Sequence, residues 1–340
     1  MPDRISAPAA RPEQWSRRTV LLAGLALGAS GCTFSDPAVR GPGATRSTPA
    51  PSPTPSPLAP GLSRDLAAET ALAAGARARR ARTDADDERR LDLLELLDQA
   101  HTERAAALVA PEPATRPTDG STPTPSPTPS PTPGPVPSLE RLAADERALA
   151  GRYRAAAVAA EGPDALLWGS MAVASGSFAA ALVAEEPPRP ADVADHRPLT
   201  VVSDAAAVSA LVESLHAAVW GYQLAVGRLP ASGATHDRAL AGLRDRRALT
   251  NRLVDRLRRA GVEVPAAAPA YDPDPEVRDA GDARLLVQRM ETRLLPFVGL
   301  WLAAAARPAD REAALEELTS TVATATAWGA PLQAWPGWGD

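Results

Sequence analysis

Four side chains in the first half of the sequence have the types and spacing of a metal site: Glu69, Asp98, His101 and Glu146. Asp98 and His101 are three residues apart, so on a helix they would lie on one face. Di-metal sites in four-helix bundles take inward carboxylates from four helices, with a Glu-x-x-His pair on two of them. The set could therefore bind a divalent ion if each residue lies on the apolar face of its helix.

A helical projection places three of these residues on apolar faces. Glu69 falls inside the stripe of apolar residues around it, and His101 falls inside the stripe of the next segment, with Asp98 at the edge of that stripe. Glu146 lies among the apolar residues of the third segment. Three predicted helices thus each contribute an inward polar group.

The fourth predicted helix lacks ligands, because Ser175 and Phe178 stand where a second carboxylate-histidine pair would be needed. A two-metal site is therefore not expected. Two interpretations stay open: a buried hydrogen-bonded network that needs no cofactor, which we prefer, and a site for one divalent ion of iron, manganese or zinc.

The second half of the sequence also carries carboxylates and a histidine, but the same projection places them outside the apolar stripes. Glu213, Glu316 and Glu317 project away from these stripes, whereas His216 and Glu291 lie on a flank. We predict that they are solvated or capping groups, and that this half binds no metal.

Other catalytic patterns are missing from the sequence, and we predict no catalytic residue. The four histidines are His101, His196, His216 and His236, and none accompanies a nucleophile-elbow motif. The single cysteine, Cys32, follows a secretion signal. Walker and dinucleotide-binding fingerprints are absent too.

The elements that must position these residues are helices, because apolar residues recur at spacings of three and four. We predict an all-α fold of two four-helix bundles in tandem, within residues 63–186 and 204–340, with a disordered Pro-rich insert at 111–137 in the first. The expected helices span residues 63–82, 84–109, 138–160, 163–186, 204–228, 235–260, 275–306 and 308–328.

Residues 1–31 resemble an export signal. Arg17 and Arg18 precede an apolar run of signal-peptide length that is too short to span a bilayer, as in twin-arginine signals. The next residues, Ala29-Ser30-Gly31-Cys32, resemble the lipobox of bacterial lipoproteins, so we predict lipidation of Cys32. Simple cleavage and secretion is the alternative.

Residues 32–62 are rich in Pro, Ser and Thr and predict an extended spacer between the membrane and the bundles. The chain contains no lysine and carries a net charge of −5. Its arginine runs are therefore expected to be solvated faces, and the acidic balance argues against nucleic acid as a partner.

Three tryptophans, Trp328, Trp335 and Trp338, gather near the C-terminus of a chain that has few aromatic residues. We expect this tail to pack as a lid over one end of a bundle. The alternative is an exposed contact with a partner or with cell-wall glycan, because indoles supply a large contact area.

The segment His216–Tyr222, with Gly227-Arg228-Leu229 after it and Pro269-Ala270-Tyr271 later, resembles a family of ferritin-like domains of unknown function. Such domains occur in exported lipoproteins of high-GC Gram-positive bacteria. The resemblance covers residues 205–338 and implies that both bundles are ferritin-like, the first as a diverged relative. Leu215 stands where the family commonly has a glutamate, which removes a ligand from the second bundle.

These observations predict a lipoprotein on the extracytoplasmic face of the cell membrane, held in the bilayer by an N-terminal diacylglycerol. Its bundles would bind an envelope protein or a cell-wall component, or act as a scaffold, without catalysis and without a cofactor. The alternative is a metal-binding or oxidase protein with its site at Glu69, Asp98, His101 and Glu146.

Overall fold

The computed structural model describes residues 60–109, 135–191, 200–273 and 276–339, and these residues form eight α-helices. The export signal, Cys32 and nearly all of the spacer lie outside the described residues, as does most of the predicted insert at 111–137. The helices are α1 (Pro60–Arg80), α2 (Glu88–Val109), α3 (Leu139–Ala159), α4 (Gly162–Leu182), α5 (Asp204–Arg228), α6 (Ala234–Arg259), α7 (Ala280–Ala304) and α8 (Pro308–Ala327).

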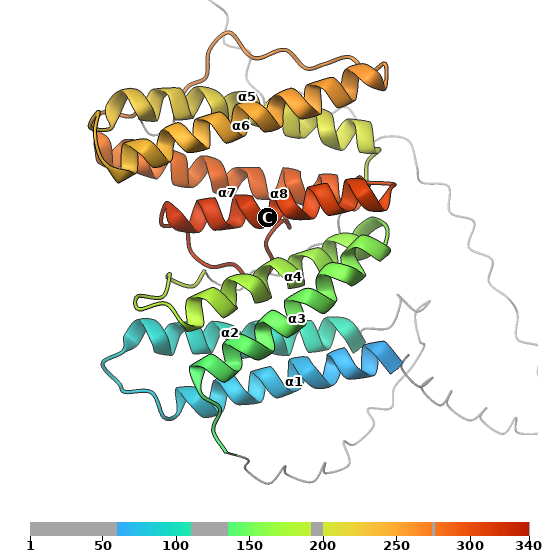
Figure 1. Cartoon of the computed structure of the whole chain (residues 1–340), viewed down its shortest axis with the longest axis vertical. Coiled ribbons are helices and arrows are strands. Elements are labelled where there is room, and N and C mark those ends of the chain that lie inside the picture. The colour runs from blue at the N-terminus through green and yellow to red at the C-terminus, as the bar shows by residue number, and fades with distance from the viewer. Residues whose placement is uncertain (1–59, 110–134, 192–199, 274–275, 340) are drawn as a thin grey trace, which may run out of the picture. The chain divides into compact units, whose positions relative to one another are not determined.

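The helices pack in pairs as two four-helix bundles, α1–α4 and α5–α8, which confirms the predicted all-α fold (Figure 1). Ser138 and Ser203 begin α3 and α5, because each hydroxyl accepts a backbone N–H from the first turn. The seventh helix begins at Ala280 and not at residue 275 as predicted. Asp279 sets this boundary, since its carboxylate accepts the N–H groups of Gly281 and Asp282.

Helix α4 is apolar around its whole circumference, and a helix of that kind must be buried on more than one side. Its length and its mean hydropathy of 1.5 would suit a membrane span, yet 72% of that stretch is buried inside the protein. Met171 and Phe178 lie in the core of the first bundle, whereas Leu166 and Val173 lie in a core shared with α5–α8. Within the described residues, α4 therefore joins the two bundles.

The C-terminal tail packs on the first bundle, although it comes after the last helix of the second. Trp335 is 5% exposed, and its indole N–H donates to Glu103 at 3.1 Å. Leu332 joins the same core and pairs with the backbone of Arg189 and Ala191. The tail is thus buried, as a lid would be, but it does not lie over one end of a bundle as predicted, because Trp338 packs against the cores of both bundles.

Two arginine side chains cap the C-terminal ends of helices other than their own. Arg90 donates to the carbonyls of Leu182 and Ala184 at the end of α4. Arg311, which is 2% exposed, donates to Val158 at the end of α3 and to Ala305 just after α7. A cation at a helix C-terminus satisfies free carbonyls and is favoured by the helix dipole.

Truncation of one core leucine in each bundle tests this packing. Leu142 and Leu294 are each 2% exposed, so Leu142→Ala and Leu294→Ala should each lower the free energy of unfolding by about 2–5 kcal/mol. Urea denaturation measures the change. The matched control is Leu240→Ala at a 36% exposed position, where the change should stay within about 0.5 kcal/mol. Equal effects at Leu240 and the core sites would contradict this packing.

Candidate functional site

Three of the predicted site residues meet in the first bundle. Glu69 from α1, His101 from α2 and Glu146 from α3 are all 0% exposed. His101 Nδ1 lies 2.5 Å from Glu69 Oε2, and His101 Nε2 lies 2.6 Å from Glu146 Oε1. The hydroxyl of Tyr153 donates to Glu69 Oε1 at 2.5 Å. We call these four residues the His101 cluster.

The two carboxylates keep His101 protonated. Burial alone lowers the pKa of His101, but the charge and hydrogen bond of Glu146, together with those of Glu69, raise it to about 9. Burial alone would raise the pKa of Glu69. Its hydrogen bonds with His101 and Tyr153 and the charge of Arg104 outweigh burial and lower this pKa below the ordinary value. The imidazolium therefore donates both N–H groups, one to each carboxylate.

Arg104 supplies a second buried positive charge one turn further along α2, and it is 0% exposed. Its guanidinium donates to Ser175 Oγ at 3.1 Å and to the carbonyl of Ala334 at 3.0 Å, and it lies 5.2 Å from the ring centroid of Phe178. The two cations of α2 match the two buried carboxylates, so the interior of this bundle is electrically balanced.

The fourth predicted residue, Asp98, does not join the cluster, which corrects the prediction. Its carboxylate accepts two hydrogen bonds from Arg77 of α1, at 2.7 and 2.9 Å, and its side chain is 21% exposed. Asp98 lies at the edge of the apolar stripe of α2, where a bidentate guanidinium can reach it from solvent. Asp98 is therefore held in an ion pair near the surface, whereas His101 lies in the core.

The observed donor set does not fit a two-metal centre. Both ring nitrogens of His101 are engaged by carboxylates, and the α4 side of the cavity, where Ser175 and Phe178 replace ligands, is filled by Arg104. Among the described residues, no three carboxylate, histidine or cysteine side chains are arranged to hold an ion. Glu146 Oε2 is the one oxygen of this cluster that is buried without a hydrogen-bond partner in the part of the chain that the structure describes.

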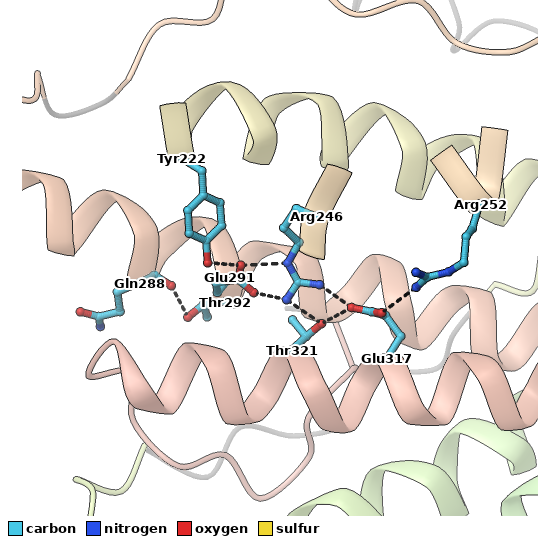
Figure 2. Close-up of polar contacts among 8 residues, drawn as sticks. All are labelled: Tyr222, Arg246, Arg252, Gln288, Glu291, Thr292, Glu317 and Thr321. Carbon is cyan, nitrogen blue, oxygen red and sulfur yellow. Dashed lines mark hydrogen bonds and ion pairs between the residues drawn. The ribbon is translucent and has the colours of Figure 1, made fainter. Parts of the chain in front are cut away.

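The second bundle contains a cluster that sequence reasoning missed, and Figure 2 shows its polar contacts. Arg246 of α6 is 4% exposed and binds Glu291 of α7 through two hydrogen bonds of 2.9 and 2.5 Å. Its third nitrogen donates to Glu317 of α8, and the hydroxyl of Tyr222 of α5 donates to Glu291 at 2.7 Å. Thr321 connects Arg246 with Glu317. We call these five residues the Arg246 cluster.

The prediction that Glu291 and Glu317 are solvated is wrong, because Glu291 is 0% exposed and Glu317 is 12% exposed at its side chain. Glu291 lies on the flank of an apolar stripe and Glu317 lies one turn before the buried Thr321, and the guanidinium of Arg246 draws both toward the interior. Glu213 and Glu316 are exposed as predicted.

One signal in the sequence could have revealed the Arg246 cluster and the buried charge of Arg104. Arg246 stands at the helical spacing of the buried residues Leu243, Leu249 and Leu253, and Arg104 stands four residues before the buried Leu108. A long charged side chain at a core position requires an internal partner of opposite charge. Placing the arginines on the helical projection together with the carboxylates would have shown that these buried cations need partners of opposite charge.

The two clusters share one pattern. In each, a buried glutamate accepts a hydrogen bond from a tyrosine hydroxyl and also binds a cation from the second helix of the bundle. Burial and the charge of Glu291 raise the pKa of Tyr222, and burial and the charge of Glu69 raise that of Tyr153, so both phenols stay neutral donors. Burial lowers the pKa of Arg246, but the charge of Glu291 outweighs this effect and raises it, so Arg246 stays cationic.

The fold and the two clusters define a tandem helical-bundle protein with balanced buried charges. Residues 206–340, which cover α5–α8 and the tail, match the model of a domain of unknown function, DUF4439. The chain is also similar to a solved structure, the conserved hypothetical protein Rv2844 from Mycobacterium tuberculosis. That pair is 28% identical with a TM-score of 0.34, over 37% of this chain and 93% of that chain. No curated protein matches.

The raised pKa of His101 predicts how stability depends on pH. The folded pKa of about 9 exceeds the ordinary value of 6.5, so the stabilisation by this charge is complete below pH 6.5 and is lost as the pH rises through 9. Urea denaturation between about pH 6 and pH 10 should show this loss in the wild type and not in His101→Gln. Parallel pH profiles of the two proteins would contradict the assignment of this charge.

Removal of the buried cation of the second bundle should be costly. Arg246→Met leaves Glu291 buried without its charge partner, so we expect a loss of about 3–5 kcal/mol in the free energy of unfolding. The double variant Arg246→Met with Glu291→Leu should regain much of this loss, because it removes both charges together. A double variant as unstable as the sum of the single variants would contradict the coupling.

Proposed function

We propose that this protein is a lipid-anchored protein on the extracytoplasmic face of the cell membrane, and that its two bundles form a non-catalytic binding or scaffold module. The anchor is inferred from Ala29-Ser30-Gly31-Cys32, which comes after the apolar run behind Arg17 and Arg18. The lipid bilayer would then be one partner, reached through an N-terminal diacylglycerol. A protein or wall component of the envelope would be the other, since a net charge of −5 disfavours nucleic acid.

The observation that carries the non-catalytic role is that the buried cations of both clusters are bound by carboxylates. Both nitrogens of His101 are bound to carboxylates, and Arg246 binds Glu291 and Glu317 with all three of its nitrogens. A general acid or base must reach a substrate proton. These groups are instead buried and reach one another, which supports a structural role for both clusters.

Removal of the lipidated cysteine tests the anchor. Cys32→Ala should move the protein from the membrane fraction to the medium, because the diacylglycerol is attached at this thiol in the proposal. Immunoblotting of membrane and medium fractions measures the shift. Cys32→Ser serves as a matched variant and should give the same result. Retention of a processed Cys32→Ala protein in the membrane would refute the anchor.

A second candidate is a protein with one divalent metal ion, and a specific observation favours it. Three ligand-type side chains from three helices meet at His101, and Glu146 Oε2 is buried without a hydrogen-bond partner among the described residues. These side chains are not arranged to hold an ion as they stand, so Glu69, His101 and Glu146 would hold one, with the Lewis-acid or redox chemistry it would supply, only after a rearrangement. Binding would require His101 to lose its proton and to exchange its carboxylate contacts for the metal.

Metal analysis of the purified full chain separates the two candidates. For the proposed binding module we expect no stoichiometric iron, manganese or zinc, and a melting temperature that added metal leaves unchanged. About one equivalent of metal that raises the melting temperature, and that is lost in both His101→Ala and Glu146→Ala, would establish the metal candidate instead. Arg246→Met, in the other bundle, is the control that should leave metal content unchanged.

A further inference from the structure

The C-terminal tail reaches from the end of α8 into the core of the first bundle, and we call its residues 329–338 the tail strap. The strap forms no helix. The N–H of Leu332 donates to the carbonyl of Arg189 at 2.8 Å, and the N–H of Ala191 donates to that of Leu332 at 2.7 Å. Leu332 and Trp335 are 2% and 5% exposed, so the strap packs in the apolar core of a bundle to which it is not joined by a helix.

Glycines with positive φ mark both ends of the strap. Gly329 has a φ of +94° and Gly337 has a φ of +92°, and glycine adopts such a backbone without steric cost. A third glycine lies beneath the strap, because a Cβ at Gly299 would collide with the carbonyl of Gly337. The strap therefore lies directly on the backbone of α7 and is joined to α8 by a residue of high conformational freedom.

The packed strap leaves two polar atoms of the first bundle unpaired. Arg104 Nε is a donor and Glu146 Oε2 is an acceptor, and both residues are 0% exposed. Neither atom has a hydrogen-bond partner within the described part of the chain. The other nitrogens of Arg104 donate to Ser175 and to the carbonyl of Ala334 in the strap. Buried donors and acceptors without partners lower the stability of this closed arrangement.

The two unpaired atoms belong to neighbouring groups. Glu146 binds His101, and Arg104 follows His101 by three residues, so the two cations lie on one face of α2. The ring of Phe178 lies 6.2 Å from that of His101 and 5.2 Å from the guanidinium of Arg104. Arg104 has a long side chain, so a change of its rotamers can exchange Ala334 for Glu146 as a partner.

We propose that the tail strap detaches from the first bundle while both bundles stay folded, and that Arg104 then binds the free oxygen of Glu146 in place of Ala334. The exchange keeps the buried cation paired, since a carboxylate is a stronger acceptor than the carbonyl it replaces. The open strap uncovers the core surface under Leu332 and Trp335, so the fold contains an apolar surface that is accessible only in this state. The device goes beyond the proposed binding role and does not depend on the anchor.

Native-state hydrogen exchange of the purified full chain tests whether the strap opens by itself. The amides of Leu332 and Ala191 should exchange about tenfold or more faster than that of Leu149 in the core of α3, because a local opening requires less free energy than global unfolding. Low urea should accelerate exchange at Leu149 and leave it nearly unchanged at Leu332, since a local opening exposes little new surface. Equal rates and an equal urea dependence at these amides would overturn the proposal, because the strap and the bundles would then unfold together.

Two matched variants test the exchange of partners. Glu146→Gln removes the carboxylate that Arg104 binds in the open state, so exchange at Leu332 should be about tenfold slower than in Glu69→Gln. Glu69→Gln is the control, because it removes the other carboxylate of His101 and leaves Glu146 in place. Exchange at Leu332 that is as fast in Glu146→Gln as in the control would show that Arg104 does not move to Glu146 and would overturn the proposed change of partner.

Discussion

A buried carboxylate must be matched by a cation inside the protein, and the interior of both bundles is arranged around this requirement. Glu69, Glu146 and Glu291 are 0% exposed, and removing their charges from water costs several kcal/mol per ion unless a partner offsets it. His101 and Arg246 supply that partner through contacts of 2.5–2.9 Å. Each contact joins two helices, so charge balance fixes the register in which they pack.

The same requirement makes the two bundles depend on each other. The guanidinium of Arg104 contributes its charge to the first bundle, and one of its donors is satisfied by the carbonyl of Ala334 in the tail of the second. The domain match at 206–340 therefore ends in residues that complete the polar core of the preceding bundle. In this chain, the matched region packs together with α1–α4 as part of one folded unit.

The sequence predicted what local periodicity controls and missed what depends on partners from other helices. The eight helices arise from apolar spacing, and Glu69, His101 and Glu146 were found because each interrupts an apolar stripe. Asp98 and Glu291 lie at the edges of apolar stripes. Whether such a side chain points to solvent or to the core depends on the arginine nearby, which is Arg77 for Asp98 and Arg246 for Glu291. The ties of Arg104 to the tail could not be predicted either, since they form only where the tail of the second bundle meets the first.

The choice of cation also decides how firmly the helices of the second bundle are held together. A guanidinium offers five N–H donors in one plane, so Arg246 can hold carboxylates of α7 and α8 at once and cannot dissociate as a metal ion can. The ties that Arg246 makes between α6, α7 and α8 are therefore permanent parts of the fold.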